Sequence, residues 1–100
     1  MILTVEFKPE TAAEAEEAYL WYESRSPGLG SDFVLALDAC VTRVQRNPKA
    51  YEAVHKEIRR ALLKRFPYGV YYLHDEPKLT IYAVFHGKRD PKVLADRLKI

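Results

Sequence analysis

The fold is decided by residues 58–91, IRRALLKRFPYGVYYLHDEPKLTIYAVFHGKRDP. The stretch is rich in Val, Ile, Tyr, Phe and Leu, the residue types that strands prefer. Phe66-Pro67 breaks it once, because proline has no N–H to donate to a ladder, and the polar loop at 75–78 breaks it again. The pattern predicts strands at residues 58–65, 68–74 and 79–86. Because links this short join antiparallel neighbours, we expect an antiparallel meander.

The residues before this stretch predict elements that cover the sheet. Residues 2–7 alternate as a half-buried strand does. A helix is predicted from Pro9, whose missing N–H costs nothing in a first turn, to Ser24. A second helix runs from the capping residues Gly30, Ser31 and Asp32 to Asn47-Pro48. Residues 48–57 are a connector, and residues 95–100 form either a short last helix or a frayed end.

The element order β-α-α-β-β-β predicts an α+β fold with a short C-terminal tail. A chain of 100 residues is one domain, residues 1–100. The short turn between the helices makes them an antiparallel hairpin. We therefore expect an antiparallel sheet packed on an N-terminal helix hairpin.

Both helices carry an apolar face at helical spacing. In the second helix the pattern is strict, with residues at i, i+4, i+7, i+8 and i+11: Phe33, Leu37, Cys40, Val41 and Val44. The face of the first helix combines small and aromatic residues: Ala12, Ala15, Ala18, Tyr19 and Tyr22. Leu20 and Trp21 lie beside that stripe. We expect them to pack in the core, with a surface for a second layer or a partner as the alternative.

The predicted strands are apolar on both alternations. In the last strand, one face carries Leu79, Ile81, Ala83 and Phe85, and the other carries Tyr82 and Val84. The helix pair covers one face, so the other needs another cover or stays partly exposed. We therefore expect a permanent partner across the sheet or along its edge.

The composition fits a soluble globular domain, with 48% hydrophobic and 30% charged residues. No apolar run is long enough to span a membrane, and the N-terminus MILTVEF lacks the pattern of a signal peptide. The single cysteine, Cys40, lies in an apolar helical pattern and is expected to be a buried thiol rather than a nucleophile. A cytoplasmic location is consistent with these features, and we expect neither a cofactor nor a metal.

Charge is distributed unevenly along the chain. Residues 1–50 hold 5 Lys/Arg and 8 Asp/Glu, a net charge of −3, and residues 51–100 hold 11 and 6, a net charge of +5. The asymmetry indicates a basic sheet side that meets an acidic partner. Ordinary surface charge is the alternative.

Three segments, taken together, resemble the ParE branch of the RelE/ParE toxin superfamily: WYESRSPGLGSDF, KRFPYGVYY and FHGKRDP. The likeness extends over about residues 7–97, and the family fold matches the element order above. These proteins are toxins of bacterial type II toxin–antitoxin systems, including plasmid stabilisation modules. The resemblance implies a cognate antitoxin, ParD-like or similar, whose tail wraps the toxin.

The resemblance also implies one of two activities. ParE-like members bind DNA gyrase and block it, whereas RelE-like members cleave mRNA in the ribosome. Cleavage by a 2′-hydroxyl needs a base, an acid and cations that hold the charged phosphorane. Carried over from RelE-like ribonucleases, two basic positions are kept, at Arg60 and Arg89. Three features are missing, because their positions fall at Gly69, Leu62 and Ala95. Gly69 supplies neither charge nor proton, which argues against the RelE mechanism.

A rebuilt ribonuclease site is the alternative. His86 would serve as base or acid, and Arg89, Lys88 and Arg65 would offset phosphate charge. The structural interpretation is that His86 only caps its strand. The basic pairs Arg59-Arg60 and Lys64-Arg65 either protect an edge strand from aggregation or form a contact row. The turn at 86–91 is favoured as a functional surface.

We therefore expect a non-catalytic ParE-like toxin that inhibits DNA gyrase by binding and is held inactive by its antitoxin. The alternatives are a metal-independent, ribosome-dependent mRNA endoribonuclease using His86, Arg89 and Arg65, and an inactive toxin-like binding module. No membrane partner is expected. The expected contacts with target or antitoxin are Arg59, Arg60, Lys64, Arg65, His86, Lys88 and Arg89.

Overall fold

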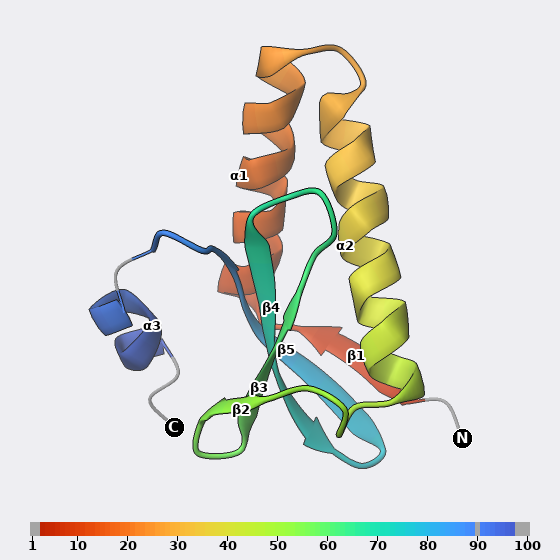
Figure 1. The fold of residues 1–100 in the computed structure, drawn as a ribbon, viewed down its shortest axis with the longest axis vertical. Coiled ribbons are helices and arrows are strands. Elements are labelled where there is room, and N and C mark those ends of the chain that lie inside the picture. Colours follow the sequence, from red (N-terminus) through yellow and green to blue (C-terminus); the bar gives the residue numbers. More distant parts are fainter. Residues whose placement is uncertain (1–2, 90, 98–100) are drawn as a thin grey trace.

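A mixed five-stranded sheet and a helix hairpin build the molecule, seen in a computed structural model that describes residues 3–89 and 91–97 (Figure 1). The elements follow one another as β1 (Thr4–Phe7), α1 (Pro9–Arg25), α2 (Leu29–Arg46), β2 (Ala53–His55), β3 (Ile58–Leu62), β4 (Tyr68–Asp75), β5 (Lys78–His86) and α3 (Pro91–Arg97). The strand order is β1-β5-β4-β3-β2, with β1 parallel to β5 and the other pairs antiparallel. The predicted α+β fold, the helix hairpin and the antiparallel meander are confirmed. The sheet as a whole is mixed rather than antiparallel, because β1 runs parallel to β5.

Three element boundaries differ from the prediction. The connector at 48–57 contains β2, which is too short for its alternation to be read from sequence. β3 ends at Leu62, and the chain then turns with Arg65 at a left-handed φ of 72°, so Lys64 and Arg65 do not lie on the strand. The tail forms α3 from Pro91, earlier than residue 95, and residues 98–100 of the predicted tail lie outside the described residues.

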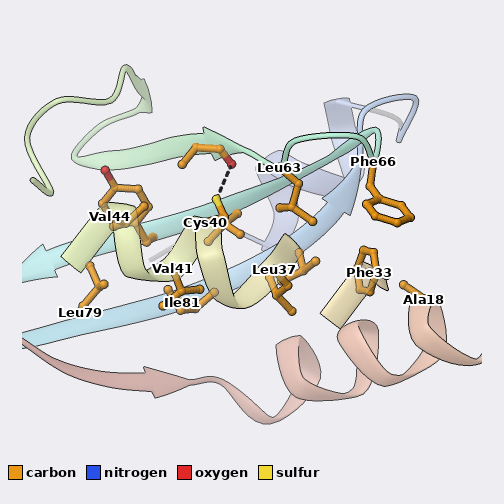
Figure 2. Packing of buried hydrophobic residues seen from close by; sticks show 14 of the residues in the cluster. Ala18, Phe33, Leu37, Cys40, Val41, Val44, Leu63, Phe66, Leu79 and Ile81 are labelled. Carbon is orange, nitrogen blue, oxygen red and sulfur yellow. Dashed lines mark hydrogen bonds between the residues drawn. The ribbon is translucent and has the colours of Figure 1, made fainter. Parts of the chain in front are cut away.

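The main core lies between α2 and the sheet. All five residues of the predicted α2 face are buried: Phe33, Leu37, Cys40, Val41 and Val44. Figure 2 shows Val41 of this helix beside Ile81 of β5, and the Cys40 thiol donating weakly to the Ala61 carbonyl oxygen at 3.8 Å. Burial raises the pKa of the Cys40 thiol, so the prediction of a buried, inert thiol agrees with its surroundings.

The first helix departs from its predicted face. Its buried residues are Thr11 and Ala18, whereas Ala12 is exposed. Leu20 and Trp21 were expected in the core, but they are 56% and 51% exposed. α1 therefore buries a narrower stripe than its composition indicates, and it presents an aromatic residue to solvent.

A carboxylate of α1 caps α2, in place of the predicted capping by Gly30, Ser31 and Asp32. The N-cap of α2 is Gly28, whose φ of 89° lies in the left-handed region that glycine favours. The Glu23 carboxylate accepts the Gly28 and Gly30 N–H groups at 3.0 and 2.9 Å. The orphan amides of the helix start are thus satisfied from the neighbouring helix.

A bulge in β5 changes which alternate residues of that strand face the helices. Tyr71 pairs with Ala83 but Tyr72 pairs with Ile81, which leaves Tyr82 as the extra residue. Before the bulge Leu79 and Ile81 face the helices. After it Val84 faces them, and Ala83 and Phe85 point to the opposite side, called the outer face below. The predicted grouping of Leu79, Ile81, Ala83 and Phe85 on one face is therefore wrong.

The outer face is covered largely by the chain itself. Ile58, Tyr71, Ala83 and Phe85 are buried there, packed with partly buried hydrophobic residues: Val54, Leu73 and Tyr82. The guanidinium groups of Arg89 and Arg97 lie over the Phe85 ring. The expected partner across this face was inferred from uncovered apolar residues, and these residues are already buried by the chain itself. No helix in the described part of the chain is long and apolar enough to cross a bilayer.

From the burial of Tyr72 we predict that the free energy of unfolding falls at high pH. The residue is fully buried and its hydroxyl donates to the Pro48 carbonyl oxygen at 2.6 Å. Burial raises its pKa to about 12, although the Arg59 guanidinium opposes the shift. The unfolded tyrosine ionises near pH 10, so this contribution is present below pH 10 and is lost as the pH rises through 12. We expect the wild-type free energy of unfolding to fall by about 1 kcal/mol between pH 9 and pH 11 from this residue.

Urea unfolding of wild type and Tyr72→Phe at the two pH values checks this. The variant starts from a lower stability, because its phenyl ring leaves the Pro48 carbonyl without that donor. Its pH-dependent loss should be smaller by about 1 kcal/mol. Equal losses in the two proteins would contradict the prediction.

Candidate functional site

A groove of about 450 Å³ lies between α1 and the end of β5. It exists because β1 follows β5 only as far as the Phe7–Ile81 pair, after which the chain turns away into α1. The rest of the β5 edge therefore faces the side of a helix. The lining residues are Glu14, Glu17, Ala18, Trp21 and Tyr22 of α1, with Pro67, Tyr68, Val84, His86 and Arg89 on the sheet side.

Aromatic side chains form the middle of the groove. Trp21 meets the Tyr22 ring edge to face, with centroids 5.0 Å apart, and lies 4.5 Å from the Arg25 guanidinium. Tyr22 also stacks on the buried Phe33. Burial raises the pKa of Tyr22 and of Tyr68, and a tyrosine is uncharged at neutral pH even without such a shift. The groove therefore offers an exposed indole held in place by the core beneath it.

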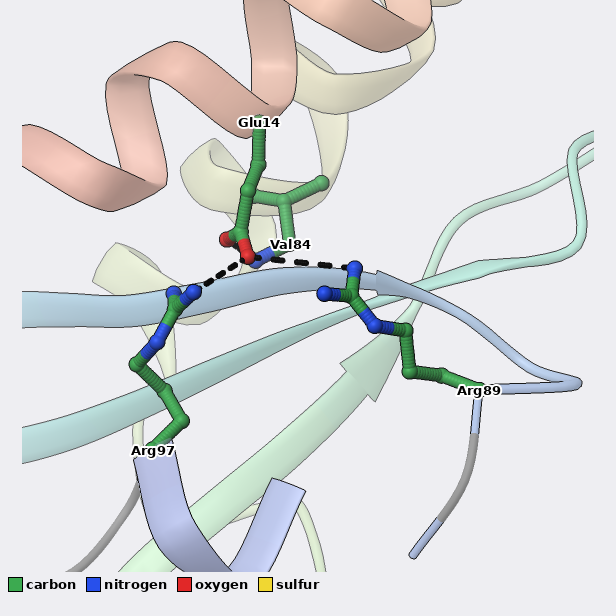
Figure 3. A network of polar contacts seen from close by, with 4 residues as sticks. All are labelled: Glu14, Val84, Arg89 and Arg97. Carbon is green, nitrogen blue, oxygen red and sulfur yellow. Dashed lines mark hydrogen bonds and ion pairs between the residues drawn. The ribbon is translucent and has the colours of Figure 1, made fainter. Parts of the chain in front are cut away.

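At one end of the groove, where Glu14 is the first lining residue along α1, a carboxylate contacts two arginines; Figure 3 shows these side chains. Glu14 Oε1 accepts the Val84 N–H at 3.3 Å, which satisfies an amide of the open β5 edge. Glu14 Oε2 lies 2.9 Å from Arg97 Nη2 and 4.0 Å from Arg89 Nη1. The side chain of Glu14 is only 12% exposed. One carboxylate thus joins α1, the β5 edge, the turn after β5 and α3.

His86, like Arg89, is a predicted site residue that lines this groove. Its Nδ1 accepts the Lys88 N–H at 3.0 Å, and its carbonyl oxygen accepts the Arg89 N–H at 2.9 Å. Its ring meets Tyr68 edge to face at 5.2 Å. These contacts give His86 the role of fixing the turn that carries Lys88 and Arg89. The Lys88 side chain is exposed.

The other predicted contact residues lie elsewhere. Arg59 donates to the Tyr51 carbonyl oxygen and fastens the segment before β2. Arg60 pairs with Glu52 at 3.8 Å, and the exposed Lys64, which follows the end of β3, lines one hollow with both of them. Arg65 pairs with Asp32 of α2 at 3.6 Å. Of the seven predicted residues, only His86 and Arg89 line the groove.

The positions carried over from RelE-like ribonucleases do meet on the outer face. A Cβ at Gly69 would lie 3.3 Å from Arg60 Cγ and 3.4 Å from Leu62 Cδ2. Gly69 also pairs with Phe85, over which Arg89 and Arg97 lie. This place therefore gathers cations, whereas His86 takes part in the groove on the other side of the strand.

Sequence reasoning missed most of the groove. In the sequence Glu14 carries only the signal of a favourable charge near a helix start, and Arg97 carries none. Trp21 does carry a signal, because it lies off the apolar stripe of its own helix. A bulky aromatic in that position is a candidate for a contact surface.

Comparison with known proteins agrees with this fold. The sequence model described as "ParE toxin of type II toxin-antitoxin system, parDE" matches residues 5–91. The chain is 29% identical over 79 residues to Toxin ParE2 of two Mycobacterium tuberculosis strains, CDC 1551 / Oshkosh and H37Rv, covering 78% of this chain and 75% of theirs. A solved structure from a chromosomal ParDE system of P. aeruginosa superposes with a TM-score of 0.74 at 17% identity, covering 85% of this chain and 96% of the other.

Proposed function

This chain belongs to the ParE toxin family of type II toxin–antitoxin systems, and from that premise we propose that it arrests growth by binding DNA gyrase in the cytoplasm. Its cognate antitoxin, a ParD-like or similar protein, neutralises it by occupying the groove. The observation that carries the binding proposal is Trp21, which is 51% exposed and lines a groove in a small domain. Exposed aromatic residues in grooves are frequent centres of protein recognition.

The arrangement of charges favours binding over RNA cleavage. Arg89 pairs with Glu14 and Arg65 pairs with Asp32 on a different helix, so both cations have internal carboxylate partners. Gly69 brings no charge to the place where a RelE-like ribonuclease has an arginine. His86 uses Nδ1 to hold its turn. Affinity for a protein surface therefore matters more here than proton transfer.

Induced expression in bacteria that carry a DNA-damage reporter tests the target. We expect growth arrest with the reporter switched on, and inhibition of supercoiling when purified gyrase is mixed with the purified toxin. Arrest with a silent reporter and intact gyrase activity would overturn the gyrase proposal in favour of translation, with His86 and Arg89 as the residues to test. Absence of arrest would contradict an active toxin.

Trp21→Ala should weaken antitoxin binding by at least about tenfold, because an aromatic anchor that becomes buried in a complex commonly contributes more than about 1.4 kcal/mol to binding. The matched control is Leu20→Ala, since Leu20 is 56% exposed on the same helix but lies outside the groove lining. Titration calorimetry with the antitoxin measures both. Equal affinities for the two variants would place the antitoxin somewhere other than the groove.

A further inference from the structure

Positive charge is concentrated in one segment of the chain, residues 43–65. This segment holds eight Lys/Arg and two Asp/Glu, a net charge of +6, whereas the rest of the chain holds eight and twelve, a net charge of −4. The segment runs from the last turn of α2 through β2 and β3 to the turn before β4. So large a net charge in so short a segment indicates a surface for a polyanion.

Part of this charge is used inside the molecule. Arg59 donates to the Tyr51 carbonyl oxygen, and Arg65 pairs with Asp32 at 3.6 Å. The carbonyl end of α2 carries a partial negative charge of about one half, which Arg46 in its last turn offsets. These three cations therefore contribute little to a binding surface.

Other cations of the segment gather in a hollow of about 440 Å³ beside the edge of β3. Its charged lining residues are Arg43, Arg60, Lys64 and Glu52, which gives the hollow a net charge of +2. Among the described residues, Glu52 pairs with Arg60 alone, at 3.8 Å, and the Lys64 ammonium has no ion-pair partner. The hollow thus has more cations than its own carboxylate can balance.

The edge of β3 beside the hollow is not free to pair with another strand. β2 pairs with β3 only as far as Arg59, so the Leu62 backbone lies beyond the paired part. The Leu62 carbonyl oxygen accepts Arg43 Nη2 at 3.2 Å. A strand added at this place would find that oxygen occupied by a guanidinium. The hollow is therefore suited to a ligand that binds through cations rather than through backbone pairing.

The lining of the hollow fits a phosphate backbone better than exposed bases. Guanidinium and ammonium groups bind phosphate oxygens without regard to sequence, whereas proteins that hold single strands add exposed aromatic rings on which bases stack. Of the described lining residues only Tyr51 is aromatic, and its half-buried ring packs edge to face on Tyr72 at 6.5 Å. A duplex keeps its bases stacked and its phosphates outside, so it suits this surface.

We infer that the hollow lined by Arg43, Arg60 and Lys64 binds the phosphate backbone of double-stranded DNA. The choice of DNA rests on the proposed function, because gyrase acts on duplex DNA and a toxin bound to gyrase meets that polyanion at close range. The hollow shares no lining residue with the groove that contains Trp21. Contact with the antitoxin and contact with DNA therefore use different parts of the molecule.

Fluorescence anisotropy of the purified 100-residue chain with a labelled mixed-sequence duplex tests the inference. We expect a dissociation constant between about 1 and 100 μM near physiological salt, the range of non-specific binding. Because three cations would each neutralise one phosphate, affinity should fall about 40-fold between 50 and 200 mM salt. Absence of binding at about 100 μM toxin in the lower salt, or binding that salt does not weaken, would overturn the inference.

Two other nucleic acids of the same sequence test the choice of ligand. Single-stranded DNA should bind more weakly than the duplex, because the hollow has no exposed aromatic ring for stacking. An RNA duplex should bind no more tightly than the DNA duplex. Tighter binding of either competitor would contradict a site for duplex DNA.

Lys64→Gln isolates one phosphate contact. Lys64 is exposed and follows the end of β3, so the loss of its charge leaves the fold intact. Affinity at low salt should fall about fivefold, and the salt slope should decrease by about one. Lys88→Gln is the matched control, since it removes the same charge from an exposed lysine outside the hollow. An equal or larger loss for Lys88→Gln would place the DNA elsewhere and overturn the assignment.

Glu52→Gln tests the charge balance of the hollow. The change removes its one lining carboxylate and raises the net charge from +2 to +3, so DNA binding should tighten about threefold. Glu57→Gln removes the same charge from an exposed position outside the hollow, on the turn between β2 and β3. Its effect should be smaller. Unchanged or weaker binding of Glu52→Gln would count against the hollow.

Gyrase inhibition is measured on the same preparations, so that the two proposals can fail separately. A toxin that binds duplex DNA at the hollow but leaves supercoiling unaffected would overturn the proposed function and support the DNA site. A toxin that inhibits gyrase but shows no affinity for DNA alone would overturn this inference and support the proposed function.

Discussion

Replacing Phe33 by alanine is expected to lower the free energy of unfolding by about 4 kcal/mol, the usual cost of emptying a buried aromatic site. Phe33 is fully buried at the start of α2. Its ring lies 5.4 Å from Tyr22, 5.5 Å from Phe66 and 5.1 Å from Tyr68, so its loss removes three aromatic contacts at once. A domain of this size has a total stability of about 5–15 kcal/mol, so this loss would remove a large fraction of it.

Urea unfolding at pH 7 measures the effect, with Leu35→Ala as the control. Leu35 is on the same helix and is 66% exposed, so its truncation should change stability by no more than about 0.5 kcal/mol. A loss below about 2 kcal/mol for Phe33→Ala would mean that the aromatic cluster collapses into the space. Because Tyr22 and Tyr68 line the groove, we also expect the variant to bind the antitoxin more weakly.

The helix hairpin could be predicted because the apolar spacing that defines each helix lies within one short segment of the sequence. The apolar spacing in α2 corresponds residue by residue to burial, since a helix repeats its faces every 3.6 residues and a core selects one face. The strands were harder, because both alternations are apolar. When both sets of alternate residues in a strand are apolar, the alternation does not reveal a bulge. The bulge at Tyr82 could therefore not be predicted from the sequence.

The groove could not be predicted from local patterns, because its parts come from distant segments. Glu14 and the Val84 N–H that it accepts are 70 residues apart in sequence. Nothing near Glu14 distinguishes it from the other glutamates of α1. Trp21 is the exception, since its displacement from the apolar stripe of α1 is visible in the sequence itself.

The charge asymmetry of the sequence has an internal use that composition alone does not reveal. Ion pairs join the acidic first half to the basic second half: Glu6–Lys78, Glu14–Arg89, Glu14–Arg97 and Asp32–Arg65. The asymmetry thus supports the folding of one half onto the other. The acidic partner that the asymmetry also predicts stays a prediction.

Replacing Gly30 by valine should destabilise the protein by about 3 kcal/mol, because the two helices approach closely there. A Cβ at Gly30 would lie 2.6 Å from the Tyr19 carbonyl oxygen, 2.8 Å from Tyr19 Cδ1 and 2.9 Å from Glu23 Cβ. The nearest atom belongs to the backbone of α1, so a rotamer change cannot relieve the contact. α1 would have to move away from α2, and the bonds from Glu23 to the Gly28 and Gly30 amides would lengthen.

The control for this change is Ala39→Val, which adds a β-branched side chain to an exposed position of the same helix. It should cost only the difference in helix propensity, about 0.5 kcal/mol. Urea unfolding of both variants isolates the steric part. Equal losses would show that the hairpin can open at Gly30 without cost. In that case the position of Trp21, which follows Tyr19 closely on α1, would not depend on the close approach of the two helices.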